Sequence, residues 1–157
     1  MLKINKIVWP TDFSEPSYEA LHTAVKVADH FQSELVCVHI MEPTPTTSEW
    51  ADASNLSVPL SLQEEEARLV KALEDIAADR VPKTLKQRLI VEIGDLPHGL
   101  FKVVERESAD LIVIATHGRK GWRRMVFGSV AEAVIRDAEC PVLTIKPAHD
   151  EAAQADD

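Results

Sequence analysis

The sequence predicts an α/β domain in three layers, with an open sheet of five parallel strands covered by helices on both faces. Strand-like and helix-like segments alternate along the chain, which is typical of parallel sheets with helical crossovers. The strand-like segments are short apolar runs, several of them without polar alternation, and such runs indicate strands buried on both faces. Glycine, proline and capping residues separate the segments and predict where each one ends.

Five strands are predicted from the apolar runs. Most runs are rich in β-branched residues and are bounded by turn residues or by a helical pattern. Pro10 is expected to end the first strand and Gly94 the third. The predicted strands are Ile4–Trp9, Leu35–Ile40, Leu89–Ile93, Leu111–Ala115 and Pro141–Ile145.

Four helices are predicted between the strands. Ser14 is expected to cap the first helix after a turn over Thr11–Ser14, because Glu15 and Pro16 are both favoured in a first turn. This helix should end near His30. The apolar positions expected to face the core recur at helical spacing. They are Leu21, Ala24, Val25 and Ala28; Leu69, Val70, Leu73, Ile76 and Ala77; Leu100, Phe101 and Val104; and Val130, Ala133, Val134 and Ala138.

Two of the helix starts carry the Ser-x-x-Glu pattern of a capping box. Ser61 pairs with Glu64 in one of them, and Ser129 pairs with Glu132 in the other. The remaining helix is expected to start at Asp95–Pro97. The pattern therefore predicts Ser61 and Ser129 as the residues that cap their helices.

Residues 1–147 are predicted to form one domain, followed by an acidic, flexible tail over 148–157. A length of 157 residues suits a single domain with its own core. Glu42–Leu60 contains three prolines and Trp50, and it is long for a connection between a strand and a helix. We find no internal repeat and no domain boundary.

The composition argues against several classes of function. The formal net charge of −9 does not favour nucleic-acid binding, which depends on neutralising phosphates. No apolar run approaches the about 20 residues of a membrane helix, so no membrane insertion is expected. Cys37 and Cys140 are far apart and form no disulfide framework, and Met1–Asn5 is too short and polar for a secretory signal. A cytoplasmic protein is therefore expected.

The segment Ala115–Val130 is the candidate phosphate-binding loop. It follows a strand, enters a helix, and contains Gly118 and Gly128-Ser129 with four basic residues between them. Backbone N–H groups and a helix N-terminus in such a loop suit phosphate. The loop matches neither the Walker nor the G-x-G-x-x-G pattern. An alternative stays open: the glycines only make turns, Ser129 only caps its helix, and the basic side chains are solvated.

Asp12 follows the first predicted strand and has two possible roles. It can accept a hydrogen bond from an adenosine base or sugar, or help to bind a metal; alternatively it only forms an Asx turn before Ser14. His39 and His117 stand at element ends, but no nucleophile pairs with either of them. Since no carboxylate pair marks acid/base catalysis either, no catalytic residues are predicted and the protein is not expected to be an enzyme.

Over Ile7–Pro147 the chain resembles the universal stress proteins. The segments that carry the resemblance are Ile7–Ser14, His39–Ile40, Ala109–Ile114, Thr116–Arg119, Gly128–Glu132 and Cys140–Leu143. The resemblance implies a Rossmann-like sheet, similar to that of the adenine nucleotide alpha hydrolases, with strand order 3-2-1-4-5. Asp12 and the loop from Ala115 would then face each other across the switch point between the first and fourth strands.

Members of the ATP-binding branch carry G-x-x-G, nine residues, and then G-[ST]. This chain matches with Gly118, Gly128 and Ser129 but has Ala115 in place of the first glycine. The resemblance implies ATP, with AMP and ADP as alternatives, and Mg²⁺ bound through the phosphates rather than by the protein. Pro10, Thr11, Asp12 and Ile40 would surround the adenosine, and Ile114 and Ala115 would pass beneath the sugar. The remaining implied cofactor residues are His117, Gly118, Arg119, Gly128, Ser129 and Val130.

The resemblance also implies a homodimer through the last strand, Val142–Ile145, which would otherwise be an open apolar edge. The function implied is a nucleotide-binding signalling or stress-response module that acts on an unidentified regulatory protein. Three alternatives remain: a member that binds no nucleotide and acts only through its surface, a slow ATPase, and a phosphoacceptor receiver domain. The last would use Asp12, Asp95, Thr116 and Lys146.

Overall fold

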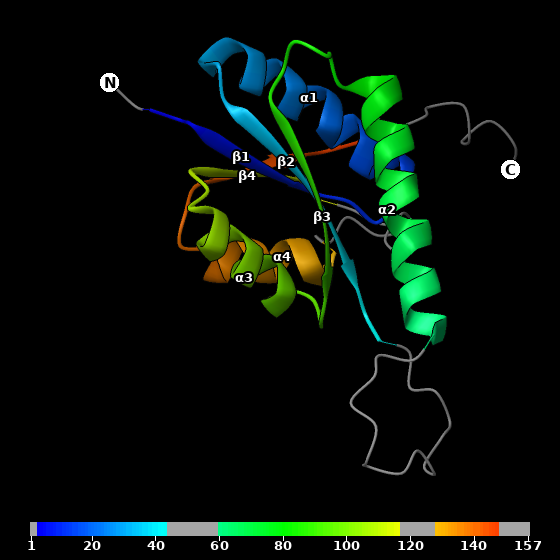
Figure 1. Cartoon of the computed structure of the whole chain (residues 1–157). Helices are drawn as coiled ribbons and strands as arrows, with labels where there is room; N and C mark the ends of the chain where they lie inside the picture. The colour runs from blue at the N-terminus through cyan, green and yellow to red at the C-terminus, as the bar shows by residue number, and fades with distance from the viewer. Residues whose placement is uncertain (1–2, 44–59, 117–127, 148–157) are drawn as a thin grey trace, which may run out of the picture.

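The computed structural model describes residues 3–43, 60–116 and 128–147. Within them, one parallel sheet has the order β3-β2-β1-β4-β5, which confirms the predicted fold class and strand order. Helices α1 and α2 cover one face, and α3 and α4 cover the other (Figure 1). The elements are β1 Lys6–Pro10, α1 Glu15–Phe31, β2 Glu34–Met41, α2 Leu60–Arg80, β3 Gln87–Ile93, α3 His98–Glu107, β4 Leu111–Ala115, α4 Ser129–Asp137 and β5 Val142–Ile145.

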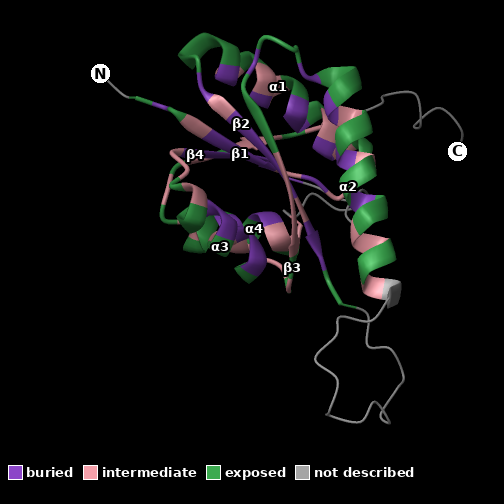
Figure 2. Cartoon of the chain, in the orientation of Figure 1, coloured by how far each residue is buried: buried purple, intermediate pink, exposed green. Residues whose placement is uncertain are grey.

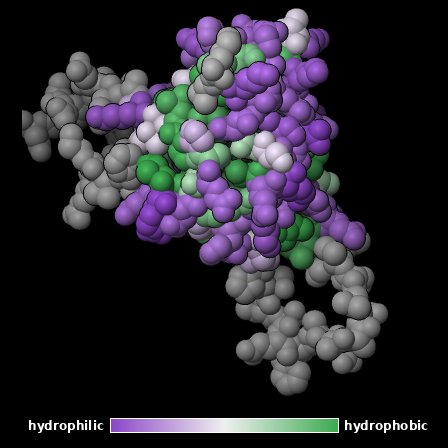
Figure 3. Space-filling model, turned by 90° about the vertical axis from the view of Figure 1, so that its left-hand side faces the viewer, coloured by the Kyte–Doolittle hydropathy of each residue, from purple (hydrophilic) through white to green (hydrophobic). Residues whose placement is uncertain are grey.

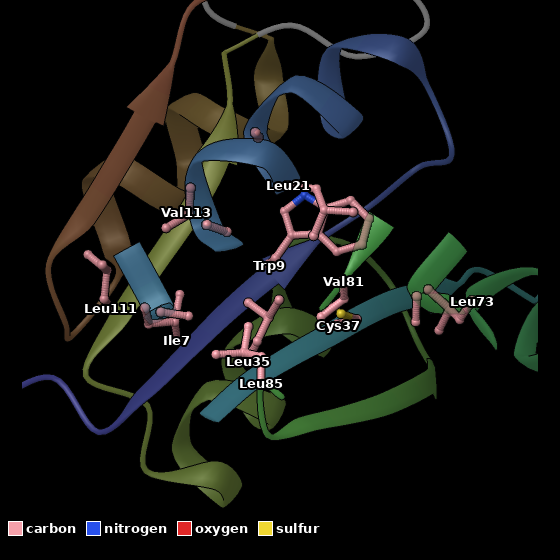
Figure 4. Packing of buried hydrophobic residues seen from close by; sticks show 14 of the residues in the cluster. Ile7, Trp9, Leu21, Leu35, Cys37, Leu73, Val81, Leu85, Leu111 and Val113 are labelled. Carbon is pink, nitrogen blue, oxygen red and sulfur yellow. The ribbon is translucent and has the colours of Figure 1, made fainter. Parts of the chain in front are cut away.

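Two hydrophobic cores lie on the two faces of the sheet, and successive strand residues alternate between them. On β1, Ile7 and Trp9 belong to the core under α1 and α2, whereas Val8 belongs to the core under α3 and α4. Figure 4 shows Trp9 between Leu21 and Val81 in the first core. The buried residues run along the middle of the sheet in Figure 2. Burial on both faces explains why the central strands read as continuous apolar runs.

Helix α1 begins and ends as its sequence predicts. Ser14 is the N-cap, and its hydroxyl oxygen accepts a hydrogen bond from the Ser17 N–H at 3.4 Å. At the other end, Gln32 adopts the left-handed conformation, and its N–H points to the carbonyls of Ala28 and Asp29. Both ends therefore satisfy backbone groups that a helix leaves unpaired.

The two predicted capping serines are not caps. Helix α2 begins at Leu60, so Ser61 lies inside it, and the N-cap of α4 is Gly128, which makes no side-chain capping bond. In both cases the helix begins earlier in the chain than the capping-box pattern predicts. Gly128 can serve as the N-cap because glycine adopts the extended conformation that this position needs, here with ψ of 146°.

Some strand ends and one core position also differ from the prediction. Pro10 is the last residue of β1 rather than its stop signal, and it lies opposite Val38. Its missing N–H removes no bond to β4, because the residues paired across β1 and β4 are Ile7 and Val8. Pro141 precedes β5, and Val70 of α2 is 36% exposed because it lies beside the buried stripe formed by its neighbours.

Some predictions fall outside the described residues. They are Trp50, most of the connection over Glu42–Leu60, and the acidic tail over 148–157. The division into one domain and a tail therefore stays a prediction. Among the described helices, none is long and apolar enough to cross a membrane.

The two cysteines are expected to differ in reactivity. Cys37 is buried in β2, and burial raises the pKa of its thiol to about 12. Cys140 is only partly buried; this burial also raises the pKa of its thiol, but its side chain is partly accessible to a reagent. Because the thiolate is the nucleophile, Ellman's reagent at pH 8 should react promptly with about one thiol per native chain and with both in denaturant. Cys140→Ser should remove the prompt reaction, and prompt reaction of two native thiols would contradict the burial of Cys37.

The same burial of Cys37 has a pH dependence. The folded state keeps this thiol protonated, so its contribution to stability is fully present below the unfolded-state pKa of about 8.5. That contribution is then lost as the pH rises toward the folded-state pKa of about 12.

Candidate functional site

The carboxyl ends of β2, β1 and β4 lie next to one another and carry most of the predicted site residues that the structure describes. Thr11 and Asp12 follow β1, Ile40 is near the end of β2, and Ala115 ends β4. Neighbouring strands are about 4.8 Å apart, so the ends of β2 and β4 are separated by about 10 Å. A nucleotide laid across β1 can span that distance. His117, Gly118 and Arg119 lie outside the described residues.

The turn between β1 and α1 is held by its own side chains. The Asp12 Oδ1 accepts hydrogen bonds from the Ser14 N–H, at 3.1 Å, and from the Ser14 hydroxyl. The Phe13 N–H donates to the Thr11 Oγ1 at 2.9 Å, and Phe13 has a φ of 60°. Such a φ is unusual for a bulky residue and accompanies tightly determined turns. Asp12 therefore forms the Asx turn that the sequence offered as one alternative, and the turn fixes its carboxylate at the sheet edge.

Thr11 is tied to β2 through both of its backbone groups. Its N–H donates to the Val38 carbonyl at 2.8 Å, and its carbonyl accepts from His39 Nδ1 at 2.8 Å. Since a carbonyl can only accept, Nδ1 of His39 carries the proton in this bond. The Thr11 hydroxyl is buried and contacts the Ser17 hydroxyl at 2.9 Å. Thr11 thus positions the turn, and His39 has a structural partner that sequence reasoning missed because the two residues are 28 positions apart.

A cavity of about 600 Å³ opens beside Asp12 on the α1 and α2 side of the sheet. Its lining is apolar where the rings and aliphatic side chains of α1, α2 and β2 meet, and charged along α2. The rings of Phe13 and His39 lie against each other with centroids 4.6 Å apart. The lining residues are Asp12, Phe13, Tyr18, His39, Met41, Glu42, Glu65, Arg68, Leu69, Ala72, Asp75 and Ile76.

The lining of this cavity is acidic. It contains four carboxylates and one guanidinium, that of Arg68, and one of the carboxylates, that of Asp75, is paired with the Lys71 ammonium. The Arg68 Nε donates to the Glu65 carboxylate at 2.9 Å, and this bond lowers the pKa of Glu65 and raises that of Arg68. Because Arg68 is already paired, the cavity suits a planar or apolar group with N–H donors and disfavours a phosphate.

The N-terminus of α4 lies at the opposite end of the candidate site, next to the end of β4. The Gly128 N–H donates to the Thr116 carbonyl at 2.8 Å, and the Thr116 N–H donates to the Ile145 carbonyl at 2.9 Å. Gly128 has a negative φ, and among the described residues a Cβ added there would come no closer than 3.5 Å, to the Thr116 oxygen. Among the residues that the structure describes, neither the backbone nor the neighbouring atoms require glycine at the cap.

The two apolar residues at the end of β4 are oriented toward different cores. Ala115 is paired with Ile145, is not among the described residues with positive φ, and packs in the core under α1 and α2. A glycine is therefore not needed there for backbone reasons. Ile114 packs in the other core, as Ile40 does. Ile40 and Ile114 thus turn their side chains away from the cavity, and only their backbones are available at the edge of the sheet.

Ser129 and Val130 occupy the first turn of α4. Ser129 is the first helical residue rather than the cap, and Val130 is partly buried against the core under α3 and α4. Helix N-termini present unpaired N–H groups and partial positive charge, which suits an anion. Within residues 3–43, 60–116 and 128–147, no group of three or more His, Cys, Asp or Glu side chains could hold a metal ion.

Comparison with known proteins gives a consistent assignment. A model of the universal stress protein family matches residues 3–146. The universal stress protein MJ0531 of Methanocaldococcus jannaschii is 34% identical over 141 residues, covering 90% of this chain and 81% of that protein.

Two solved structures are similar in fold and were determined with nucleotides. A universal stress protein in complex with cAMP is 20% identical, with a TM-score of 0.64 over 92% of this chain and 98% of that one. A universal stress protein family member from Arabidopsis thaliana with AMP bound is 17% identical, with a TM-score of 0.58 over 96% of this chain and 97% of that one. At these identities the likeness concerns the fold alone.

Proposed function

The chain belongs to the universal stress protein family, and we propose that it binds an adenine nucleotide along the carboxyl ends of β2, β1 and β4. One observation carries the proposal: the N-cap of α4 is Gly128, which places no side chain over the helix N-terminus although the backbone and the described neighbours leave room for one. A glycine cap of this kind lets a phosphate approach the free N–H groups.

The charges of the described residues support one orientation of the nucleotide. The acidic cavity beside Asp12 disfavours phosphate and suits a base with an amino group, since its carboxylates accept N–H donors. The N-terminus of α4, about two strand spacings away, suits the phosphates. The base would therefore lie near Asp12 and Ile40 and the phosphates near Gly128 and Ser129.

The sequence favours ATP within this class. Four basic residues stand between Gly118 and Gly128, outside the described residues, and they would offset more than one phosphate. Mg²⁺ would be held through those phosphates. The related structures with cAMP and AMP support a nucleotide at this fold but leave AMP and ADP as alternatives. Since no catalytic group is predicted, the nucleotide would act as a regulatory ligand that changes what the protein contacts.

The proposal is tested first on protein purified without added nucleotide. Acid or heat denaturation should release adenine nucleotide, identified by anion-exchange chromatography and mass spectrometry. Reloading the emptied protein with ATP should restore about one nucleotide per chain. The absence of nucleotide both in the release and after reloading would favour the alternative of a family member that binds none.

We also propose a homodimer through β5. This strand is at the edge of the sheet, pairs only with β4 within the described residues, and exposes 36% of Leu143. Ile135 of the adjacent α4 is 46% exposed. Figure 3 shows one face of the molecule, on which hydrophobic areas lie between hydrophilic ones. An apolar edge strand of this kind is normally paired or covered.

The dimer is expected to depend on Leu143. Leu143→Glu should shift the protein from dimer to monomer in analytical ultracentrifugation. The substitution would bury two carboxylates, one from each protomer, against each other without an opposite charge, which is unfavourable. The matched control is Ile93→Glu on β3, the other edge strand, where Ile93 is 41% exposed. Equal masses for the wild-type protein and Leu143→Glu would contradict an interface on β5.

The location and partner of the protein also belong to this proposal. Cys37 and Cys140 are both free thiols, which favours a reducing compartment and hence the cytoplasm. The nucleotide-loaded dimer would contact a regulatory protein. That partner can be identified by comparing the proteins that bind to the nucleotide-loaded form with those that bind to the emptied form.

A further inference from the structure

The turn between β3 and α3, together with the first turn of α3, holds three successive residues: the last two of β2, Ile40 and Met41, and the residue after the strand, Glu42. Gly99 packs against the side chain of Ile40. The Gly94 N–H donates to the Met41 carbonyl at 3.1 Å, and the Leu96 N–H donates to the Glu42 Oε1 at 3.3 Å. The end of β2 is therefore fixed from the α3 side by residues 94–99, none of which lines the cavity or belongs to the α4 terminus.

The contact between Gly99 and Ile40 is a tight one. A Cβ at this position would lie 3.0 Å from the Ile40 Cγ2 and 3.4 Å from its Cδ1, which is tighter than ordinary packing. Gly99 has no positive φ, so the backbone itself would accept alanine. Glycine suits this position because α3 approaches β2 so closely that a Cβ would require the Ile40 side chain to give way by a few tenths of an ångström.

Ile40 has little freedom to move away from an added methyl group. It is 6% exposed and packs among Val38, Leu100 and Val103 in the core under α3 and α4. Its backbone is paired with Glu92 of β3. A push on the Ile40 side chain would therefore shift the β2 backbone rather than only rotate the side chain.

A shift of β2 would reach the turn that carries Asp12. Thr11 is hydrogen-bonded to the Val38 carbonyl and to the His39 ring, both at 2.8 Å. Displacement of the end of β2 therefore changes the position of Thr11 and of the Asp12 carboxylate beside the cavity. The contacts run from α3 through Gly99, Ile40 and β2 to Thr11.

We propose that Gly99 is a positioning residue for the nucleotide site: it lets α3 seat Ile40 and so sets the distance between the ends of β2 and β1. This inference rests on the proposed nucleotide binding. Gly99 acts through Ile40 and does not itself contact the ligand, because it lies on the opposite face of the sheet from the cavity.

The test measures ATP affinity by calorimetry in wild-type, Gly99→Ala and Gly94→Ala proteins. Gly99→Ala is expected to weaken ATP binding by about 10-fold, since a shift of a few tenths of an ångström misplaces the groups that hold the base. Gly94→Ala is the matched control: among the described residues its Cβ would meet only the Gly99 Cα, at 3.9 Å, so the variant should leave the affinity within about twofold of wild type.

A double-mutant cycle with Ile40→Ala separates positioning from a general loss of stability. Ile40→Ala removes the side-chain atoms that the new Cβ would touch, so adding Gly99→Ala to it should weaken binding no further. Independent, multiplicative effects in the cycle would overturn the proposal, as would an unchanged ATP affinity in Gly99→Ala with only a lower melting temperature. If the wild-type protein binds no ATP, the proposed function fails together with the positioning role. If the wild-type protein and Gly99→Ala bind ATP equally well, only the positioning role of Gly99 fails.

Discussion

Gly128→Asp is expected to abolish ATP binding while leaving the fold as stable as the wild type or slightly more stable. The position accepts a side chain, because its φ is −55° and an added Cβ would be 3.5 Å from the Thr116 oxygen. Aspartate is a preferred N-cap and interacts favourably with a helix N-terminus. A carboxylate there would nevertheless repel a phosphate at the same N–H groups. The repulsion between unit charges about 4 Å apart near a protein surface is about 4 kcal/mol, which corresponds to an affinity loss of about 1,000-fold.

The matched variant is Gly128→Asn, which has nearly the same shape and capping ability without the charge. Calorimetry should show ATP binding by Gly128→Asn that is weaker than wild type but far stronger than that of Gly128→Asp. Thermal unfolding should show both variants folded. Equal ATP affinity in Gly128→Asp and wild type would contradict the placement of phosphate at α4, and equal loss in both variants would indicate a steric rather than an electrostatic effect.

Trp9→Ala is expected to lower the free energy of unfolding by about 3–5 kcal/mol, the largest stability change that we predict. Trp9 is fully buried between the sheet and α1 (Figure 4), and its indole N–H donates to the Ser17 carbonyl at 2.8 Å. Its removal leaves a large cavity at the end of β1, just before the turn that carries Asp12. The free energy of unfolding of a typical domain is only about 5–15 kcal/mol in total. Urea unfolding of Trp9→Ala should therefore show a midpoint at a much lower urea concentration.

Trp9→Phe is the control for this substitution. It keeps an aromatic ring in the core but removes the donor to Ser17, so a loss of about 1–2 kcal/mol is expected. A loss below about 1 kcal/mol for Trp9→Ala would mean that the surrounding core collapses into the space. The account of two tightly packed cores would then be wrong on the α1 side.

The fold could be predicted because its signals are local or carried by the resemblance. The apolar runs of the central strands and the helical spacing of residues such as Leu21 and Leu73 follow directly from burial. The exact helix starts could not be predicted in the same way. Ser-x-x-Glu fits a helix equally well with the serine at the first helical position, as at Ser129, so the pattern alone did not identify Gly128 as the cap.

The supporting contacts of the candidate site could not be predicted from the sequence. The bond from His39 to Thr11 and the packing of Gly99 on Ile40 join segments that are far apart in the chain. Nothing in the local pattern marks a glycine that is required by a neighbouring strand. The α2 side of the cavity was missed because the rotation of α2 about its axis decides which of its residues, Glu65 and Arg68 among them, line it.

The most direct test of the central claim is a calorimetric titration of ATP with Mg²⁺ into wild-type protein from which any bound nucleotide has been removed. We predict saturable binding of about one ATP per chain, half-complete below about 1 mM, the usual range for cellular ligands. Adenosine alone should bind more weakly, because it lacks the phosphates that would contact α4. No binding heat at millimolar ATP, in protein that is folded by circular dichroism, would contradict the assignment of this site to a nucleotide.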